Sequence, residues 1–215
     1  MLKEGCSWRA LGKQGISWQT VYAHYRRWLG GGVIEGILQR LDWPGHTLQG
    51  IGSMDSSHMK VHRDGSNPAG GQTPQAIGKS RGGSNTKLHV LVSGPGRPLK
   101  LILSGGNRHD STQAEALIEG QHLDAVLADR AYDNNRLRTV FAQHAATTCV
   151  PSKRNRKEPI EHDAELFKKR HVVENFFEKI KRCRRVATRY DKLAETFLGF
   201  VKLSIIVANL RGIFL

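Results

Sequence analysis

The sequence has few cysteines and few acidic residues, and both shortages narrow its possible functions. Only three cysteines occur in 215 residues, Cys6, Cys149 and Cys183, and they form no CxxC pair. This argues against a disulfide framework and a cysteine-rich zinc site, and it suits a reducing cytosol. Asp and Glu total 19 against 33 Lys and Arg, a net charge of +14. Such a surplus favours nucleic acid as a partner, because neutralising phosphates releases condensed counterions.

Long apolar segments are also missing. The N-terminal stretch MLKEGCSWRALGK has no apolar centre of the kind found in signal peptides. Residues 197–215 are mostly apolar, but Lys202 and Arg211 interrupt them. The uncharged run between these two residues is far shorter than the roughly 20 residues that a membrane-spanning helix requires. We therefore expect a buried core helix in this region, a soluble protein and no membrane partner.

The first part of the chain is expected to be a small helical segment over 1–45, before a main domain over 46–215. Ser17 is a suitable N-cap for a helix over 17–29 with apolar residues on one face, and three glycines at 30–32 end it. Arg26 and Arg27 are candidates for contacts with DNA phosphates, although a helix that only packs against the protein is an equal alternative. Pro44-Gly45 marks the expected boundary.

The main domain begins with strands and continues with alternating strands and helices. Strands are expected over 50–62, 86–94, 98–105, 124–129 and 147–152, and helices over 111–120, 134–145 and 170–182. A hairpin is expected at Gly94-Pro95-Gly96. This order predicts a mixed α/β sheet with helices on its faces.

Residues 64–86 are rich in Gly, Ser and Pro and are predicted to form a flexible, basic loop. The glycine-rich part, SRGGSN, lacks the GxxxxGK[ST] pattern of a phosphate-binding P-loop. Lys79 and Arg81 are candidates for DNA phosphate contacts, and a simply solvated loop is the alternative.

The stretch RHVVENFFEKIKR, residues 170–182, combines an apolar stripe with a cationic face. The stripe has the spacing i, i+3, i+4 and i+7 of an amphipathic helix: Val173, Phe176, Phe177 and Ile180. The other side carries the cations Arg170, Lys179, Lys181 and Arg182. Glu174 and Glu178 lie among these cations, four residues apart. Either one could be no more than an i,i+4 ion-pair partner, and the helical spacing does not choose between them.

Two further acids lie where active-site acids are often found in α/β sheets. Asp55 lies within the first expected strand, and Asp129 follows a buried run at the end of another. Together with a glutamate from the helix over 170–182, they supply three carboxylates from separate elements. Magnesium prefers such hard oxygen ligands, and two divalent ions about 3.5–4 Å apart are a common device for phosphoryl transfer. The pattern therefore predicts a two-metal site in which nearby cations hold DNA.

Other polar residues have less specific signals. His58 and His62 fall on the strand face opposite Asp55 if the period of two holds, so they are poor co-ligands for its metal. Asp110 is either a fourth carboxylate or part of an N-terminal cap, formed by Asp110 or Ser111, for the helix after it, and Asp133 is expected to cap the helix over 134–145. His109 is a candidate neighbour of the metal ligands, with no spacing to support it.

Several motifs resemble a known family. RHVVENFFEKIKR resembles the Tyr-x2-Arg-x3-Glu-x6-Lys signature of bacterial insertion-sequence transposases with a DDE domain: Arg170, Glu174 and Lys181 match, and Phe167 replaces the tyrosine. ADRAYD and GSMDSSHMKVH resemble the segments of the second and first acids, hence Asp129 and Asp55. Three further stretches are similar to the insertion sequence five family: QAIGKSRGGSNTKLHVLV, GGNRHDST and SWRALGKQGISWQTVYAHYRRW. The resemblance covers nearly the whole chain.

The resemblance implies a ribonuclease-H-like fold and a DDE strand transferase, and it selects Glu174 over Glu178. Asp55, Asp129 and Glu174 are then the catalytic residues and the ligands of two Mg²⁺ ions, for which Mn²⁺ can substitute. Arg170, Lys181 and Arg182 are expected to contact double-stranded DNA, at both the element ends and the target. A homodimer on DNA in the bacterial cytoplasm, associated with the nucleoid, is also implied.

Two departures from the family pattern leave a second hypothesis open. Phe167 lacks the hydroxyl of the family's tyrosine, and family members usually have a longer N-terminal region than this chain. The alternative function is therefore a truncated or catalytically inactive DNA-binding derivative that regulates a complete transposase.

Overall fold

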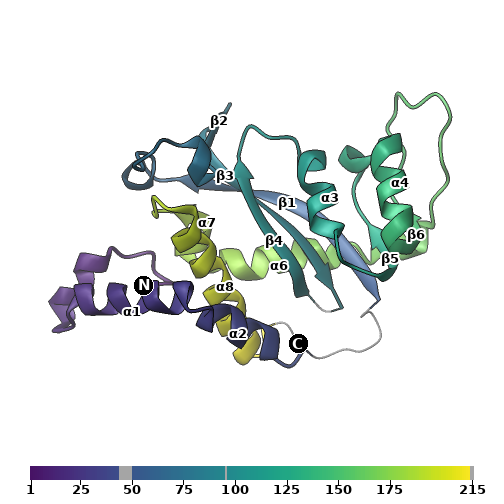
Figure 1. Cartoon of the computed structure of the whole chain (residues 1–215). Coiled ribbons are helices and arrows are strands. Elements are labelled where there is room, and N and C mark those ends of the chain that lie inside the picture. Colours follow the sequence, from purple (N-terminus) through teal and green to yellow (C-terminus); the bar gives the residue numbers. More distant parts are fainter. Residues whose placement is uncertain (44–49, 95, 214–215) are drawn as a thin grey trace.

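The computed structural model describes residues 1–43, 50–94 and 96–213, and a mixed β-sheet lies at its centre (Figure 1). The strands are β1 (Ile51–Val61), β2 (Gly78–Ser80), β3 (Gly83–Ser93), β4 (Arg97–Gly105), β5 (Leu123–Leu127), β6 (Ala145–Cys149) and β7 (Thr188–Arg189). β1 pairs antiparallel with β3 and parallel with β5, and β5 pairs parallel with β6. β4 and β2 pair antiparallel with β3, and β7 pairs with the end of β1. The strands β4-β3-β1-β5-β6 with helices on both faces confirm the predicted ribonuclease-H-like class.

The helices come from both ends of the chain and from the connections between strands. They are α1 (Trp18–Gly30), α2 (Val33–Arg40), α3 (Ala114–Ile118), α4 (Asn135–His144), α5 (Ala164–Lys168), α6 (His171–Lys181), α7 (Arg184–Ala187) and α8 (Ala194–Leu210). Ser17 caps α1 as predicted, because its hydroxyl accepts from the Thr20 amide. α6 and α8 correspond to the predicted amphipathic and core helices. None of the described helices is long and apolar enough to cross a membrane.

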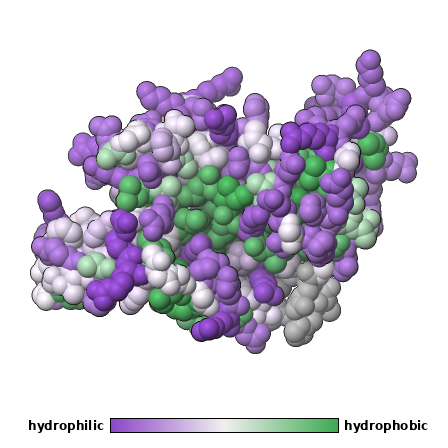
Figure 2. Space-filling model, in the orientation of Figure 1, coloured by the Kyte–Doolittle hydropathy of each residue, from purple (hydrophilic) through white to green (hydrophobic). Residues whose placement is uncertain are grey.

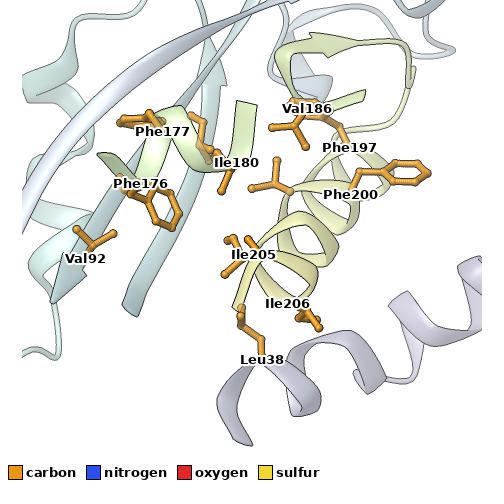
Figure 3. Packing of buried hydrophobic residues seen from close by; sticks show 14 of the residues in the cluster. Leu38, Val92, Phe176, Phe177, Ile180, Val186, Phe197, Phe200, Ile205 and Ile206 are labelled. Atoms are coloured by element: carbon orange, nitrogen blue, oxygen red, sulfur yellow. The ribbon is translucent and has the colours of Figure 1, made fainter. Parts of the chain in front are cut away.

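The sheet is buried on both faces, and side-chain alternation divides its apolar residues between two cores. Met54 and Leu91 pack with α3 and α4 on one face. Met59, Leu88 and Val90 pack with α6 and α8 on the other. Figure 3 shows side chains of α6, α7, α8, α2 and β3 meeting in this second core. Because side chains alternate along a strand, Asp55 belongs to the face of Met59, which α6 covers.

The helices of the N-terminal segment share that second core. Tyr25 of α1, together with Ile34 and Leu38 of α2, packs with residues of α8. The Tyr25 hydroxyl donates to the carbonyl oxygen of Thr196 at 2.6 Å. Packing is thus a demonstrated role of α1 and α2, whereas the predicted DNA contact of this segment stays a prediction. The expected boundary at Pro44-Gly45 lies outside the described residues.

Two arginines are buried, and their guanidinium groups form hydrogen bonds inside the fold. Arg189 is fully buried, and its guanidinium donates to the carbonyl oxygens of Gln75, Asp191 and Lys192 and to the hydroxyl of Thr86. Burial lowers the pKa of Arg189 to about 10. Buried Arg185 donates to Asp191 at 2.9 Å. The net charge of the sequence therefore overstates the charge available at the surface.

Two local predictions were wrong in detail. Residues 64–86 are not one loop, because β2 and the start of β3 form a hairpin around residues 81–82. Gly83 has a φ of 93°, a left-handed conformation that glycine adopts readily at this tight turn. Asn134, not Asp133, caps α4, since its side chain accepts from the Leu137 amide. Asp133 is buried instead, and its carboxylate accepts from Arg138 and Arg156.

The packing of α1 on α8 can be tested with a pair of glycines in helices. A Cβ on Gly199 of α8 would lie 2.4 Å from both the Tyr25 hydroxyl and a methyl group of Leu29, whereas a Cβ on Gly36 of α2 would meet nothing within 4 Å. We expect Gly199→Ala to lower the free energy of unfolding by about 1–3 kcal/mol through overpacking. Gly36→Ala should be neutral or stabilising by up to about 1 kcal/mol. Urea unfolding measures both, and equal effects would contradict the packing.

Candidate active site

The pairing of β1 with β5 brings the two predicted aspartates together. Ser53 and Leu127 are partners in this parallel pair, and Asp55 and Asp129 each follow two residues later. The Asp129 carboxylate accepts from the amide of Ala131 at 2.8 Å, at the start of the short 3-10 helix Arg130–Tyr132. The negative charge of Asp129 contributes to a higher pKa of Asp55, as expected for close carboxylates. The structure therefore places the two acids at the same height on neighbouring segments, Asp55 in β1 and Asp129 just after β5.

Asp55 is mostly buried, and burial raises the pKa of its carboxyl group above the ordinary value. Two hydrogen bonds partly offset this effect. The Ser56 amide donates to one carboxylate oxygen at 2.7 Å, and the Arg170 guanidinium donates to the other at 3.0 Å. Burial thus makes the negative charge of Asp55 unfavourable, and the positive charge of Arg170 beside it offsets part of this cost.

Arg170, just before α6, is the cation that joins the acids. One of its terminal nitrogens donates to Asp55 and the other donates to Glu174, one helical turn along. The Arg170 side chain is largely buried, while Glu174 keeps more than half of its side-chain surface exposed. Glu174 is therefore linked to Asp55 through a single guanidinium.

The environment of Glu178 differs from that of Glu174. Glu178 pairs with Arg182 at 3.1 Å, and both side chains are mostly exposed. This pair fits the alternative reading of an i,i+4 ion pair on the outer side of the helix. Glu174 also forms an i,i+4 pair, with Arg170, but that guanidinium bonds Asp55 as well, and this contact is where the two glutamates differ.

Lys181, at the other end of α6, also contacts β1. Its ammonium group donates to the hydroxyl of Ser57 at 2.6 Å, on the same strand face as Asp55. Burial lowers the pKa of Lys181. α6 therefore lies across β1: Arg170 and Lys181 bond Asp55 and Ser57, and Glu174 is joined to Asp55 through Arg170. These are the three positions that match the family signature.

A second polar cluster lies on the opposite face of β1. The Asp110 carboxylate accepts from the Ser56 hydroxyl at 2.5 Å and from the Lys87 ammonium at 2.8 Å. Burial alone would raise the pKa of Asp110, but these two hydrogen bonds outweigh it, so the pKa is lowered. Asp110 is therefore not the helix cap considered from the sequence, and His109, the residue in the N-cap position, makes no capping side-chain bond.

Lys87 was not singled out from the sequence. Its one signal is a lysine in the middle of the apolar run TKLHVLV, where a charge needs a partner once the strand is buried. Its partner Asp110 is 23 residues away along the chain. Ser56 and Ser57 likewise gave no signal, because a serine beside an acid is common on solvated strands as well.

The remaining predicted residues lie apart from the acids. Lys79 and Arg81 are exposed, at and after β2. Arg26 lies 3.6 Å from Glu195 of α8, whereas Arg27 is exposed. His58 contacts the amide oxygen of Asn85 at 2.8 Å, on the face opposite Asp55 as expected, and His62 lies 3.3 Å from Asp64.

Comparison with known proteins identifies the family. The family described as "Transposase DDE domain" matches residues 46–210. The chain belongs to this family. A putative transposase for insertion sequence element IS6501 of Brucella ovis is 38% identical over 128 residues, which cover 59% of the chain and 98% of that protein. A putative transposase for insertion sequence element IS402 of Burkholderia cepacia is 30% identical over 142 residues, covering 60% of the chain and 64% of that protein. The chain thus spans less than two thirds of the second relative's length.

The acids of this DDE domain fit a divalent cation by the chemistry of their donor atoms. Asp55, Asp129 and Glu174 offer carboxylate oxygens, the ligands that Mg²⁺ and Mn²⁺ prefer. The Arg170 guanidinium already acts as the cation between two of them. In this arrangement no three His, Cys, Asp or Glu side chains of the described residues are grouped closely enough to enclose a metal ion. Arg170 would therefore have to move before all three acids could share one.

The two carboxylates on opposite faces of β1 should respond to neutralisation with opposite signs. The raised pKa of Asp55 means that its ionisation destabilises the fold as pH rises through that pKa, so Asp55→Asn should raise the free energy of unfolding at pH 7 in metal-free buffer. The lowered pKa of Asp110 means that its ionised form stabilises the fold above the ordinary pKa, and this contribution is lost as pH falls. Asp110→Asn should therefore be destabilising at pH 7, by about 2 kcal/mol, the range of hydrogen bonds to charged groups.

Chemical denaturation between pH 3 and pH 7 with EDTA measures both variants. The two differences from wild type should shrink towards the acid end, where the carboxyl groups are protonated. Destabilisation by Asp55→Asn at pH 7 would show that burial does not dominate at that residue.

Proposed function

We propose that this protein is a DNA transposase that cuts at the ends of an insertion sequence and joins the freed 3′-OH to a target phosphodiester, using divalent metal ions. The observation that carries the proposal is the constellation of Asp55, Asp129 and Glu174: the pairing of β1 with β5 brings Asp55 and Asp129 together, and Arg170 joins Asp55 to Glu174 of α6. Family membership and two relatives named as putative transposases support it. The DNA substrate and a homodimer that brings two ends together belong to the same proposal.

Each residue has a role that follows from its position. Asp55, Asp129 and Glu174 would hold Mg²⁺, or Mn²⁺ in its place, with two ions per site. The bound ions would activate the attacking oxygen and stabilise the leaving one. Lys181, whose ammonium group bonds only Ser57 among the hydrogen bonds described for it, is placed to hold a phosphate beside the acids. Arg170 is placed to bind the neighbouring phosphate through its planar guanidinium.

In the proposed site, Arg170 couples the binding of DNA to the binding of divalent metal. Its guanidinium now bonds both Asp55 and Glu174, so it competes with any cation for these acids. A DNA phosphate offers the guanidinium another anion, which releases the carboxylates. DNA and divalent metal should therefore bind with positive coupling, and linkage requires the coupling to be reciprocal.

Strand transfer tests the proposed chemistry. Pre-cut duplexes with a free 3′-OH are incubated with a supercoiled plasmid and Mg²⁺ or Mn²⁺, and joined products are counted. We expect Glu174→Gln to reduce joining by about 100-fold or more, since changes even to groups supporting metal ligands cost 10–100-fold. The matched control is Glu178→Gln, which removes an exposed ion pair on the same helix and should keep most of the activity.

Two results would change the assignment. Loss of joining only in Glu178→Gln would move the third carboxylate to that residue. No joining by the wild type over a pool of candidate ends, with DNA still bound in a salt-dependent way, would favour the DNA-binding regulator.

Metal binding can be measured without catalysis. A divalent ion at 100 times its dissociation constant stabilises the folded state by about 2.7 kcal/mol. We expect Mn²⁺ to raise the unfolding temperature of wild type and to raise it further when a short duplex is present. Arg170→Ala removes the competing guanidinium, so Mn²⁺ should stabilise this variant without DNA at least as strongly as wild type, and the extra effect of DNA should disappear.

Asp129→Asn serves as the control, because it should abolish the response to Mn²⁺ with and without DNA. Equal coupling in wild type and Arg170→Ala would contradict the competition between guanidinium and metal.

A further inference from the structure

A cavity of about 680 Å³ lies on the strand face opposite Asp55 and is lined by cations. It is bounded by the second half of β1, by the β2–β3 hairpin and by residues 106–109 after β4. Its charged or titratable lining residues are His58, Lys60, Lys79, Arg81, Lys87, Arg108 and His109, and none of the described residues that line it is Asp or Glu. In Figure 2 the hydrophilic surface continues over the β2–β3 hairpin, at the top of the view. The absence of a lining carboxylate makes a metal cation a poor occupant and an anion a suitable one.

Two buried polar side chains form a preorganised floor. Lys87 is only 6% exposed, and its ammonium group donates to Asp110 and to the carbonyl oxygen of Arg108. An ammonium group has three donors, so one N–H is left for a ligand. Asn85, 5% exposed, donates to the Ser80 hydroxyl and to the carbonyl oxygen of Gly83, and its amide oxygen lies 2.8 Å from His58. Both of its amide hydrogens are thus used within the protein, so Asn85 holds the shape of the floor and leaves the donation to Lys87. Both side chains are thus fixed before any ligand arrives, which lowers the entropic cost of binding.

Glycine allows the backbone to approach this floor. A Cβ on Gly106 would lie 1.3 Å from the amide oxygen of Asn85, and a Cβ on Gly78 would lie 2.1 Å from that of Asn107. Gly106, Asn85 and Asn107 line the cavity, whereas Gly78 is not one of its lining residues. A side chain at either glycine would displace an asparagine, so the shape of the cavity depends on both.

The cavity is connected to the acids through β1. Lys87 bonds Asp110, Asp110 bonds Ser56, and Ser56 follows Asp55. Along the strand, His58 and Lys60 come three and five residues after Asp55, which corresponds to about 10 and 16 Å at the usual rise. The cations are also spread over three strands, the β2–β3 turn and the loop after β4, which suits a chain of phosphates better than a single one.

We propose that this cavity is a second DNA-backbone site, on the face of β1 opposite Asp55, which holds phosphodiesters of the bound DNA away from the scissile bond. The identity of the polyanion and its relation to a scissile bond rest on the proposed function. Lys87 positions one phosphate at the floor, whose shape Asn85 maintains, and Lys60, Lys79 and Arg108 contact its neighbours. The site would fix the path of the strand relative to the three acids, and its contacts carry no base specificity.

Salt-dependent DNA binding tests the site without metal or catalysis. Binding of a fluorescent duplex is measured by anisotropy in EDTA from 50 to 300 mM salt, for the wild type and for Lys79→Ala, Arg108→Ala and the double variant. Each lost phosphate contact should reduce the slope of log K against log salt by about 0.9, and affinity at 0.1 M salt by about eightfold. Lys79 and Arg108 are exposed, so their loss should leave the unfolding temperature unchanged. The matched control is Lys192→Ala, an exposed lysine outside the cavity.

The position of the contact is tested by neutralising single phosphates. Methylphosphonates are placed one at a time along each strand of a pre-cut end, and each duplex is bound to wild type and to Arg108→Ala. If the cavity holds the backbone, the two changes are non-additive at one or two adjacent phosphates and additive elsewhere. Additivity at every position, or equal losses in Lys192→Ala, would overturn the proposal.

Two further probes decide the class of ligand. Polyglutamate that competes with the duplex at equal charge concentration, or inorganic phosphate that displaces it at a few millimolar, would replace DNA by a general anion and overturn the proposal. Wild type that shows the expected non-additivity but no strand transfer would contradict the proposed enzyme while leaving this DNA site in place.

Discussion

The parallel pairing of β1 with β5 is the constraint on which the candidate site depends. Parallel neighbours in register carry corresponding residues at the same height, so Asp55 and Asp129, each two residues beyond the pair Ser53–Leu127, meet although 74 positions separate them in the sequence. β1 can hold this central place because β3 pairs with its other side and both faces are covered by helices. Burial then raises the pKa of Asp55, and α6 brings Arg170 to compensate.

Cations in this protein have three distinct uses, which net charge alone does not separate. Arg185 and Arg189 hold the core together through buried hydrogen bonds. Arg170 and Lys87 neutralise carboxylates next to the central strand, one on each face. The exposed cations of the β2–β3 hairpin and of the loop after β4 surround a cavity. The proposed DNA binding uses the last two groups, and in that proposal Arg170 links the binding of a phosphate to the state of the acids.

Much of the fold was predictable because it depends on local periodicity. The i, i+3, i+4, i+7 stripe of 173–180 is fully or almost fully buried in α6, and the apolar run of β3 is buried along most of its length. The β2–β3 hairpin was missed because glycine-rich composition indicates flexibility, whereas backbone pairing with β3 decides the structure. The sequence predicts a cap at Asp133, but Asp and Asn are equally good capping residues, so the pattern does not separate Asp133 from Asn134. The structure uses Asn134 as the cap. Asp133 is instead buried against Arg138 and Arg156, a tertiary contact that local sequence does not predict.

The sequence by itself determined the class of protein: the order of strands and helices, the excess of cations and the motifs around Asp55, Asp129 and Glu174. Only the tertiary structure placed Arg170, the i,i+4 partner of Glu174, against Asp55 of β1 while leaving Arg182, the partner of Glu178, exposed. Helical spacing alone does not separate the two glutamates, and the family motif selects Glu174 without a physical reason. The tertiary structure also joined Lys87 to Asp110 and formed the cation-lined cavity. Helical and strand periods are local properties of the chain, whereas an ion pair or a cavity between distant segments depends on how the whole sheet pairs.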